Sequence, residues 1–405
     1  MIMQVGLDRL PSLSALIRSL RHGRVGLLAH PASVDKNLVH VSRVLAQLDI
    51  HPRRIFGPEH GYGGEAQDMI GVAHAADPTS GAPIVSLYGQ AFEDLSPRRD
   101  HLADLDILLV DLSDVGSRYY TFVWTALLAV RAAHRAGVSV VLLDRPNPIG
   151  GRRLEGKPQR AEYLSFVGLE PIPVRHGLTP GEVVAEMASR DGIAVGPGEA
   201  LDVVAVQGWD RGADGTRWDR PFVMPSPNMP TVDTALVYPG GCLLEGTNLS
   251  EGRGTTRPFE VCGAPWLDGV RLAEALRALP LGGFVARPLT FQPTFHKHAG
   301  QVCGGVQVHV TDREDFRPMA TYTALIALCA YQAPDAFCFR TERYEFVDDI
   351  PAVDLLAGSA DLRKGIRDAQ EPMALIETVC AVNEADEAAH RCAVQRVMEA
   401  EARRG

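Results

Sequence analysis

The sequence has few cysteines, and none of the seven is arranged in a Cys-x-x-Cys pair. An odd number of cysteines without paired spacing argues against a disulfide framework and against a cysteine-rich zinc site. A chain of 405 residues is also long enough to fold around a large core without such crosslinks. The cysteine pattern therefore favours a reducing compartment.

Positive charge is also scarce. The sequence has 40 lysines and arginines against 50 aspartates and glutamates, which gives a formal net charge of −10. Nucleic acids and anionic membranes are bound by clustered cations, so this balance argues against both partners. No uncharged apolar run is long enough to span a bilayer, and residues 1–30 lack the apolar core of a signal peptide. We expect a cytoplasmic protein with a small-molecule partner; the oligomeric state stays open.

Common cofactor motifs are missing as well. The first apolar run leads into His30-Pro31-Ala32-Ser33 instead of a Gly-x-Gly-x-x-Gly fingerprint, and no P-loop occurs. The sequence also has no Gly-x-Ser-x-Gly elbow and no His-Glu-x-x-His metal motif. We therefore expect an activity that needs neither a nucleotide nor a metal cofactor.

Short apolar runs that alternate with helical segments are present, and this is the rhythm of βαβ units. Nearly continuous apolar runs predict strands buried on both faces of a parallel sheet. These strands are expected at Val25–Ala29, Arg54–Gly57, Ile84–Tyr88, Ile107–Leu112, Val138–Asp144 and Leu201–Val206. The helices between them are expected at Leu38–Leu48, Phe92–Leu105, Phe122–Ala136 and Thr179–Arg190. The predicted fold class is α/β, with a Rossmann-like parallel sheet in the N-terminal domain.

Proline marks the domain junction. Four prolines between residues 221 and 230 exclude a helix or a central strand in that stretch. We therefore divide the chain into an N-terminal domain, residues 1–235, and a smaller C-terminal α+β domain, residues 236–405, which completes the cleft. Helices at Leu267–Leu279 and Thr321–Ala330 and a strand at Gly305–Val310 are expected there. Residues 371–405 are predicted to form exposed helix that frays.

The first candidate site is the segment FGPEHGYGGE, Phe56–Glu65, which follows the second strand. In an open α/β sheet, ligands bind at the carboxyl ends of the strands. Glu59, next to His60, is therefore placed for general acid or base catalysis. From the residues alone, a glycine-rich turn with a solvated glutamate is an equally good interpretation.

The second candidate site is DLSDVGSRYY, Asp111–Tyr120, after the fourth strand. Asp111 and Asp114 can orient sugar hydroxyls or a water, Arg118 can clamp an anion, and Tyr119 can stack or donate a hydrogen bond. The alternative is structural: Asp114 caps the next helix and Arg118 pairs with it.

The third candidate site is EGTNLSEGRGTT, Glu245–Thr256, in the C-terminal domain. Its carboxylates, amide, hydroxyls and arginine are more polar groups than a plain loop needs, although turn chemistry remains an alternative. His296 and His298 alternate as on one face of a strand, but no carboxylate has ligand spacing to them, so a metal site is disfavoured.

Taken together, these segments resemble the NamZ-type exo-β-N-acetylmuramidases, formerly an uncharacterised domain family. The resemblance covers roughly Val5 to Gly358 and rests on seven signatures in order: GLLAHPASVD, FGPEHGYGGEAQD, DLSDVGSRYYTFVWT, DRPNPIGG, PSPNMPT, EGTNLSEGRGTTRPFE and FHKHAGQVCGGVQVHV. It implies a Rossmann-like domain joined to a smaller domain, with the active site between them. It also implies release of N-acetylmuramic acid from the non-reducing ends of peptidoglycan fragments.

The family's Gly-Pro-Glu-His-Gly glutamate falls on Glu59, which we expect to be the acid. Its catalytic partner can be Glu65, Asp114, Glu251 or the substrate's own acetamido oxygen, because the sequence does not give carboxylate separations. The remaining substrate-binding candidates are His60, Asp111, Asp114, Arg118, Tyr119, Asn228, Glu245, Asn248 and Arg253. The alternative function is a sugar-binding or sensing protein that uses the same cleft without turnover.

The chain begins directly in the predicted fold, which suits imported fragments and cell wall recycling. The segment after Gly358 differs from the aromatic and basic ending expected of the family.

Overall fold

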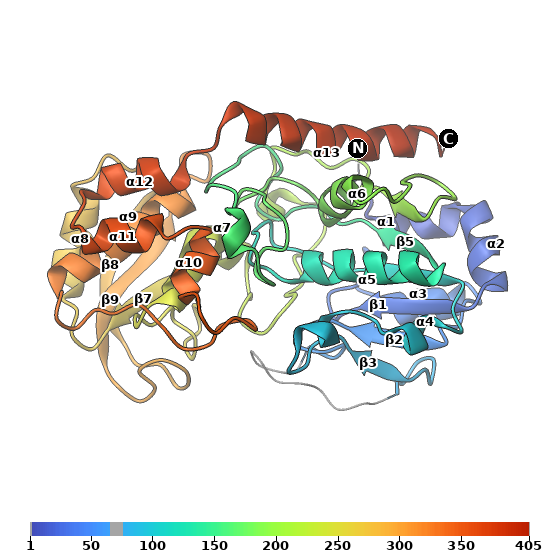
Figure 1. Cartoon of the computed structure of the whole chain (residues 1–405), viewed down its shortest axis with the longest axis horizontal. Coiled ribbons are helices and arrows are strands. Elements are labelled where there is room, and N and C mark those ends of the chain that lie inside the picture. Colours follow the sequence, from blue (N-terminus) through green and yellow to red (C-terminus); the bar gives the residue numbers. More distant parts are fainter. Residues whose placement is uncertain (1, 65–75, 405) are drawn as a thin grey trace.

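A six-stranded parallel sheet forms the centre of the N-terminal domain in the computed structural model, which describes residues 2–64 and 76–404 (Figure 1). The strand order is β3-β2-β1-β4-β5-β6, the order of a Rossmann fold. All neighbouring strands pair in parallel. The strands are β1 (Val25–Ala29), β2 (Arg54–Gly57), β3 (Ile84–Ser86), β4 (Ile107–Asp111), β5 (Ser139–Leu143) and β6 (Leu201–Val204). The predicted α/β fold class is confirmed.

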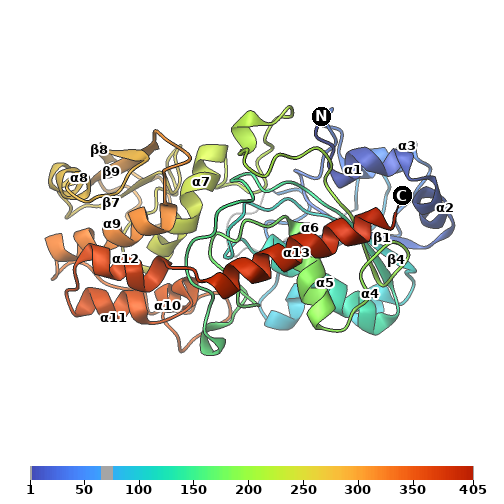
Figure 2. The same ribbon diagram turned by 90° about the horizontal axis from the view of Figure 1, so that it is seen from above.

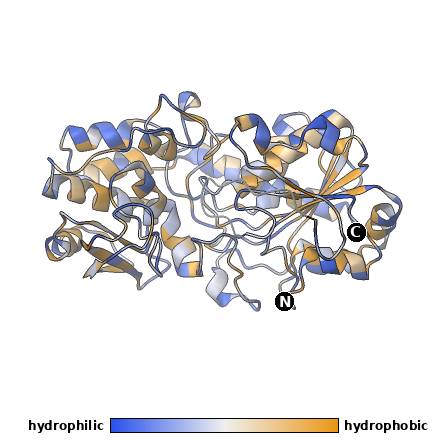
Figure 3. Ribbon diagram, turned by 90° about the horizontal axis from the view of Figure 1, so that it is seen from below, coloured by the Kyte–Doolittle hydropathy of each residue, from blue (hydrophilic) through white to orange (hydrophobic). Residues whose placement is uncertain are grey.

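The sheet is buried on both faces because its strands are apolar at nearly every position (Figure 3). Leu108 and Val110 of β4 pack into one hydrophobic cluster, while Ile107 and Leu109 pack into the other. This is the two-residue period of a strand between two layers of helices. One layer holds α1 (Gly6–Arg9), α2 (Ser14–His22) and α3 (Val41–Gln47), and the other holds α4 (Arg99–Leu102), α5 (Phe122–Ala136) and α6 (Pro180–Arg190).

Two predicted helices are shorter than the sequence suggests. The first begins at Val41 because the Asp35 side chain accepts hydrogen bonds from the backbone of Asn37 and Val39, which fixes a turn there. The segment at 92–105 splits around Pro97 into a 3₁₀ turn, η2 (Phe92–Leu95), and α4. By contrast, α5 has the predicted bounds, and α6 starts with the capping box formed by Thr179 and Glu182.

The C-terminal domain is built on a three-stranded antiparallel sheet in the order β7-β9-β8. Its strands are β7 (Val261–Ala264), β8 (Phe284–Phe291) and β9 (Cys303–Val310). Its helices are α7 (Val232–Gly241), α8 (Gly269–Arg277), α9 (Pro318–Gln332), α10 (Ala352–Ala357), α11 (Asp361–Arg367) and α12 (Pro372–Cys380). The described residues also form 3₁₀ turns. In the N-terminal domain these are η1 (Leu10–Ser12), η3 (Ala161–Tyr163) and η4 (Gly215–Arg217), and in the C-terminal domain η5 (Cys242–Gly246) follows α7.

Helix α7 lies where the two domains meet (Figure 1). It starts just after the proline-rich segment, and residue 235, the predicted domain boundary, lies inside it. Its residue Gly240 packs directly on α9, since a Cβ atom there would be 2.1 Å from the carbonyl oxygen of Pro318. One continuous hydrophobic cluster includes residues of β1, α7, α9 and α10. The domains therefore share a core.

The last helix, α13 (Glu384–Ala402), returns from the C-terminal domain to the N-terminal one and crosses α6 (Figure 2). Arg396 pairs with Glu186 of α6 at 2.9 Å, and Arg404 pairs with Asp202 of β6. Glu401 also pairs with Arg9 near the start of the chain. The predicted helix is confirmed, and most of its residues are exposed as expected. The predicted fraying is not supported, because ion pairs and three buried residues, Ala393, Val397 and Ala400, hold this helix on α6.

Arg118 is fully buried at the domain junction, and its guanidinium donates to three backbone carbonyls. Nη1 lies 2.9 Å from the oxygen of Lys157 and 3.1 Å from that of Ile172, and Nη2 lies 2.5 Å from that of Leu356 in α10. Burial lowers the pKa of Arg118 to about 10, which keeps it charged at neutral pH. This geometry corrects the anion-clamp role predicted for Arg118, because its Nη atoms bind the protein's own backbone.

Replacing this guanidinium should loosen the junction. We expect Arg118→Met to lower the free energy of unfolding by about 3 kcal/mol or more, because each buried carbonyl left without a donor costs roughly 1–3 kcal/mol. Arg160→Met is the matched control, since Arg160 spans the same junction through an exposed ion pair with Asp361 at 2.7 Å. Urea unfolding of both variants measures the difference; equal losses would contradict the role assigned to Arg118.

Candidate active site

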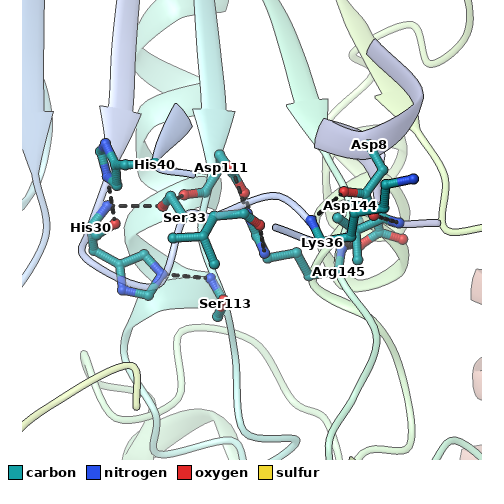
Figure 4. Close-up of polar contacts among 12 residues, drawn as sticks. Asp8, His30, Ser33, Lys36, His40, Asp111, Ser113, Asp144 and Arg145 are labelled. Carbon is teal, nitrogen blue, oxygen red and sulfur yellow. Dashed lines mark hydrogen bonds and ion pairs between the residues drawn. The ribbon is translucent and has the colours of Figure 1, made fainter. Parts of the chain in front are cut away.

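Polar side chains gather at the carboxyl ends of β1, β4 and β5, where the strand order changes direction (Figure 4). Asp111, the last residue of β4, is fully buried and accepts two hydrogen bonds from the guanidinium of Arg145, of which Nη2 to Oδ2 is 2.8 Å. Ser33 donates to the Asp111 carbonyl at 2.5 Å. Asp111 therefore ties loops together, and the prediction that it orients a sugar is not supported by this placement.

His30 belongs to the same network and is held neutral. Its Nε2 accepts a hydrogen bond from the backbone N–H of Ser113 at 2.9 Å (Figure 4). Its Nδ1 lies 3.3 Å from the Pro225 carbonyl oxygen. Burial and the nearby charge of Arg145 lower the pKa of His30 to about 3. A proton on Nε2 would destroy the bond that orders the Asp111–Tyr120 loop.

Acid should therefore destabilise the fold through His30. Because the pKa of His30 in the folded protein lies below the ordinary histidine value of 6.5, its contribution to stability is present above pH 6.5 and is lost as the pH falls toward 3. Between pH 7 and pH 5 we expect a loss of about 2 kcal/mol from this group. His30→Gln should be less stable at pH 7 but less sensitive to acid, whereas the exposed His51→Gln should keep the wild-type profile. Urea unfolding of the three proteins at pH 7 and pH 5 measures these changes. An acid dependence of stability in His30→Gln equal to that of the wild type would contradict the role assigned to His30.

Beside this network, a pocket opens between the domains. The N-terminal domain contributes residues after β2, before α5 and in the proline-rich segment. The C-terminal domain contributes residues of α7 and η5, of the segment before β7, and residues 344 and 345. The polar residues in its lining are Glu59, His60, Tyr119, Tyr120, Thr121, Ser226, Asn228, Tyr238, Glu245, Arg253, Tyr344 and Glu345. Five of the predicted site residues therefore come together here with Glu59: His60, Tyr119, Asn228, Glu245 and Arg253.

Glu59 is 6% exposed and sits two residues beyond the end of β2. The turn Pro58–Gly61 closes through a backbone bond of 3.0 Å, with His60 in the left-handed region at φ 68°. The hydroxyl of Thr121 donates to Oε2 of Glu59 at 2.8 Å. Thr121 also precedes the first turn of α5, so the Glu59 carboxyl lies near the positive end of a fifteen-residue helix. The strand end and the helix start together fix this carboxyl.

Glu245 and Arg253 form the opposite side of the pocket. Arg253 Nη2 donates to Oε1 of Glu245 at 2.8 Å, and the hydroxyl of Tyr344 donates to Oε2 at 2.7 Å. Burial and the charge of Glu245 raise the pKa of Tyr344 well above its usual range, so its hydroxyl stays a donor. Arg253 also lies over the ring of Phe259, 5.4 Å from its centroid. Glu245 and Arg253 therefore line the pocket as a pair of opposite charges that bind each other.

Glu251 lies behind this wall and outside the residues that line the pocket. Its carboxylate is 3.0 Å from Lys297 Nζ, 2.9 Å from His296 Nδ1 and 3.4 Å from Arg253 Nε. Burial opposes ionisation, but the charges of Lys297 and Arg253 and the hydrogen bond with His296 outweigh it and hold the pKa of Glu251 well below its usual range. The structure therefore places Glu251 as the fully buried centre of an ion cluster, in contrast to the catalytic role we predicted.

Other predicted residues also lie away from the pocket. Asp114 Oδ2 accepts from the backbone N–H of Gly116 at 2.6 Å and faces His176 at 3.4 Å. Asn248 bonds the backbone of Ala336 and Cys338 at 2.8 and 3.0 Å. Both side chains brace loops, and neither belongs to the pocket lining. Glu65 falls outside the described residues.

The two histidines of the FHKH segment are not on a strand. His296 and His298 lie in the loop after β8, both with left-handed backbone, at φ 69° and 57°. His296 binds Glu251, and His298 Nε2 lies 2.7 Å from the carbonyl oxygen of Asn248. Within residues 2–64 and 76–404, no three histidine, cysteine or carboxylate residues gather as ligands of a metal ion would.

Several pocket residues escaped the sequence analysis. Tyr120, Thr121 and Ser226 directly adjoin predicted residues, so their motifs carried a usable signal. Tyr344 and Glu345 come from a segment with no glycine, no repeated polar pattern and no predicted strand end, so nothing in their spacing marked them.

Comparison with known families decides the relationship. A model described as Exo-beta-N-acetylmuramidase NamZ, N-terminal, matches residues 25–233, and its C-terminal counterpart matches residues 236–392. The chain belongs to the NamZ family. The C-terminal match extends to residue 392, whereas the sequence motifs indicated a resemblance only as far as Gly358.

One relative and two solved structures are similar to the chain over most of its length. It is 42% identical over 337 residues to the peptidoglycan β-N-acetylmuramidase NamZ of Bacillus subtilis (strain 168), which covers 83% of this chain and 79% of that protein. A crystal structure of a DUF1343 family protein from Bacteroides fragilis NCTC 9343 is similar with TM-score 0.84 and 28% identity over 98% of both chains. A second one, with TM-score 0.70 and 24% identity over 97% of this chain and 98% of the other, shares the fold.

Proposed function

We propose that the protein is an exo-β-N-acetylmuramidase, a glycoside hydrolase that cleaves the β-1,4 bond after a non-reducing terminal N-acetylmuramic acid in peptidoglycan fragments. The observation that carries the proposal is the buried Glu59, which lies in the interdomain pocket of a NamZ chain. The 42% identity to a curated peptidoglycan β-N-acetylmuramidase supports the substrate class.

In the proposed mechanism, Glu59 is the general acid. Its proton passes to the glycosidic oxygen as the bond between that oxygen and the anomeric carbon breaks, and positive charge develops on the sugar ring. The Thr121 hydroxyl holds one carboxyl oxygen of Glu59 and so fixes the direction in which the carboxyl faces. His60, Tyr119 and Asn228 line the same pocket and are proposed to contact the sugar.

We further infer that the enzyme works in the cytoplasm on imported fragments, in cell wall recycling. All seven cysteines are free thiols and four of them are buried, which fits a reducing compartment. Among the described residues, no helix combines the length and apolar character needed to cross a membrane.

Turnover should depend on the Glu59 carboxyl. We expect Glu59→Gln to lower kcat on a muramic-acid disaccharide by at least ~10²-fold, because general acid–base groups contribute ~10²–10⁴-fold. A dinitrophenyl muraminide should lose much less, since its leaving group needs little protonation. Release of free sugars measures the first rate and absorbance the second.

Thermal unfolding checks that the Glu59→Gln variant is still folded. The variant Glu93→Gln, at an exposed position, controls for the loss of one negative charge. Near-normal kcat with an unchanged melting profile would make Glu59 a structural turn residue. A wild-type protein that binds the disaccharide without cleaving it would favour a sugar-binding protein.

The sugar specificity should depend on Arg253. N-acetylmuramic acid differs from N-acetylglucosamine by a lactyl ether that carries a carboxylate, and arginine binds carboxylates through paired hydrogen bonds. Among the described residues, the pocket lining contains one arginine, Arg253. We expect chromogenic N-acetylmuraminides to be cleaved far faster than N-acetylglucosaminides, and Arg253→Met to shrink this ratio by slowing the former.

The matched control is Arg257→Met, because Arg257 belongs to the same segment but is half exposed and pairs with Glu260. Rates on both substrates, with melting temperatures, test the assignment. Equal rates on the two sugars in the wild-type enzyme would refute anion recognition and indicate a broader hexosaminidase.

A further inference from the structure

A strained turn carries two of the pocket residues that sequence patterns did not mark. Tyr344 and Val347 exchange both backbone hydrogen bonds, each 3.0 Å long, so the chain reverses over Glu345 and Phe346. Both of these central residues have left-handed backbone, with φ 44° for Glu345 and 70° for Phe346. Two-residue turns of this kind favour Asn-Gly and similar pairs, because a Cβ atom disfavours positive φ.

Glu-Phe is therefore an unfavourable pair for this turn. A bulky aromatic residue with positive φ is a genuine outlier. Two successive residues with positive φ, neither of them glycine, are not expected in a turn without a specific role. Strained backbone persists only where the surroundings enforce it, and it gathers at functional sites. The surroundings of this turn should therefore include packing contacts that hold it in place and a functional role for the side chains that it positions.

Phe346 is the anchor. Its ring packs against Tyr88, Phe92 and Phe166 of the N-terminal domain, with centroid distances of 5.9, 6.3 and 6.1 Å. This aromatic cluster fastens a loop of the C-terminal domain across the domain boundary. Once Phe346 is seated, the left-handed turn directs the two preceding side chains into the pocket.

Those side chains are Tyr344 and Glu345, which are 5% and 7% exposed. Tyr344 binds Glu245. Glu345 faces the N-terminal domain, where the Tyr88 hydroxyl is 3.4 Å from its Oε2. The pocket thus brings together a carboxyl group from each domain, Glu59 and Glu345.

Among the described residues, three carboxyl groups line the pocket: Glu59, Glu245 and Glu345. Both oxygens of Glu245 accept strong hydrogen bonds, from Arg253 and from Tyr344, so this carboxylate is committed to holding them. Glu251 is outside the lining and Asp114 braces a loop. Glu345 is the carboxyl group that the strained turn adds to the pocket, and it comes from the domain opposite Glu59.

We propose that Glu345 is the second catalytic carboxylate, facing the anomeric carbon on the side opposite the leaving group; this rests on the proposed hydrolase function. Glu59 gives its proton to the departing oxygen as the bond to the anomeric carbon breaks. Glu345 takes a proton from the water whose oxygen forms the new bond to that carbon. A later proton transfer to solvent and back to Glu59 restores both groups, and the net change is addition of one water.

The variant Glu345→Gly tests the role because it removes the carboxylate and also relieves the positive φ. We expect kcat on a 4-nitrophenyl N-acetylmuraminide to fall by at least ~10²-fold. The melting temperature should be equal to or higher than that of the wild type, since glycine adopts this backbone freely. Azide added to the variant should enter the vacated space and restore turnover, with an α-glycosyl azide as the product seen by NMR.

Two control variants separate catalysis from strain. Ala369→Gly relieves a left-handed residue (φ 50°) that does not line the pocket, and should keep full activity. Glu342→Gln removes an exposed carboxylate from the same loop, and should also keep full activity.

Three outcomes for Glu345→Gly would overturn the proposal: near-normal kcat, a β-glycosyl azide, or lost turnover without any azide product. A wild-type enzyme that does not cleave muraminides would instead refute the hydrolase function itself. The two failures are therefore distinguishable.

Discussion

The junction between the two domains depends on one buried cation, the guanidinium of Arg118. It replaces lost hydration with carbonyl oxygens from three separate segments, at 157, 172 and 356. Burying a charge without such partners would be prohibitive, so those segments must stay where the guanidinium can reach them. The pocket opens beside the same loop, between Tyr119 and the C-terminal domain. The position of Glu59 relative to Glu345 is therefore only as fixed as this junction.

The N-terminal fold was predictable because its physics is local. Central parallel strands are apolar on both faces, so β1, β2 and β4 stood out as short continuous runs. Helix α6 was marked by a threonine cap, a proline and a glutamate in the right order. Helix α7 gave no such signal, since it contains Pro239 and two glycines, and tight packing on α9 overrides their low helix propensity. The final helix was predicted, but its packing was not, because its partners lie about two hundred residues away on α6 and β6.

The candidate site was predictable only in part, because polar density has two causes. Glu59, His60, Asn228, Glu245 and Arg253 do line the pocket. Asp111, Asp114, Arg118, Asn248 and Glu251 come from equally polar motifs, yet their partners are other protein groups. A sequence does not distinguish a polar group that lines a pocket from one that is buried away from it among other protein groups. Glu345 shows the opposite case, since its placement arises from a turn that its own residue types disfavour.

The return of α13 onto α6 has a consequence for how the chain is made. Residues 384–402 cover the N-terminal domain, but they follow the whole C-terminal domain in the sequence. While the protein emerges from the ribosome, the α6 face and the carboxylates of Glu186 and Asp202 remain uncovered until some two hundred further residues have been added. The first domain therefore cannot complete its surface ahead of the second, in contrast to the domain-by-domain order in which most multidomain chains fold during synthesis.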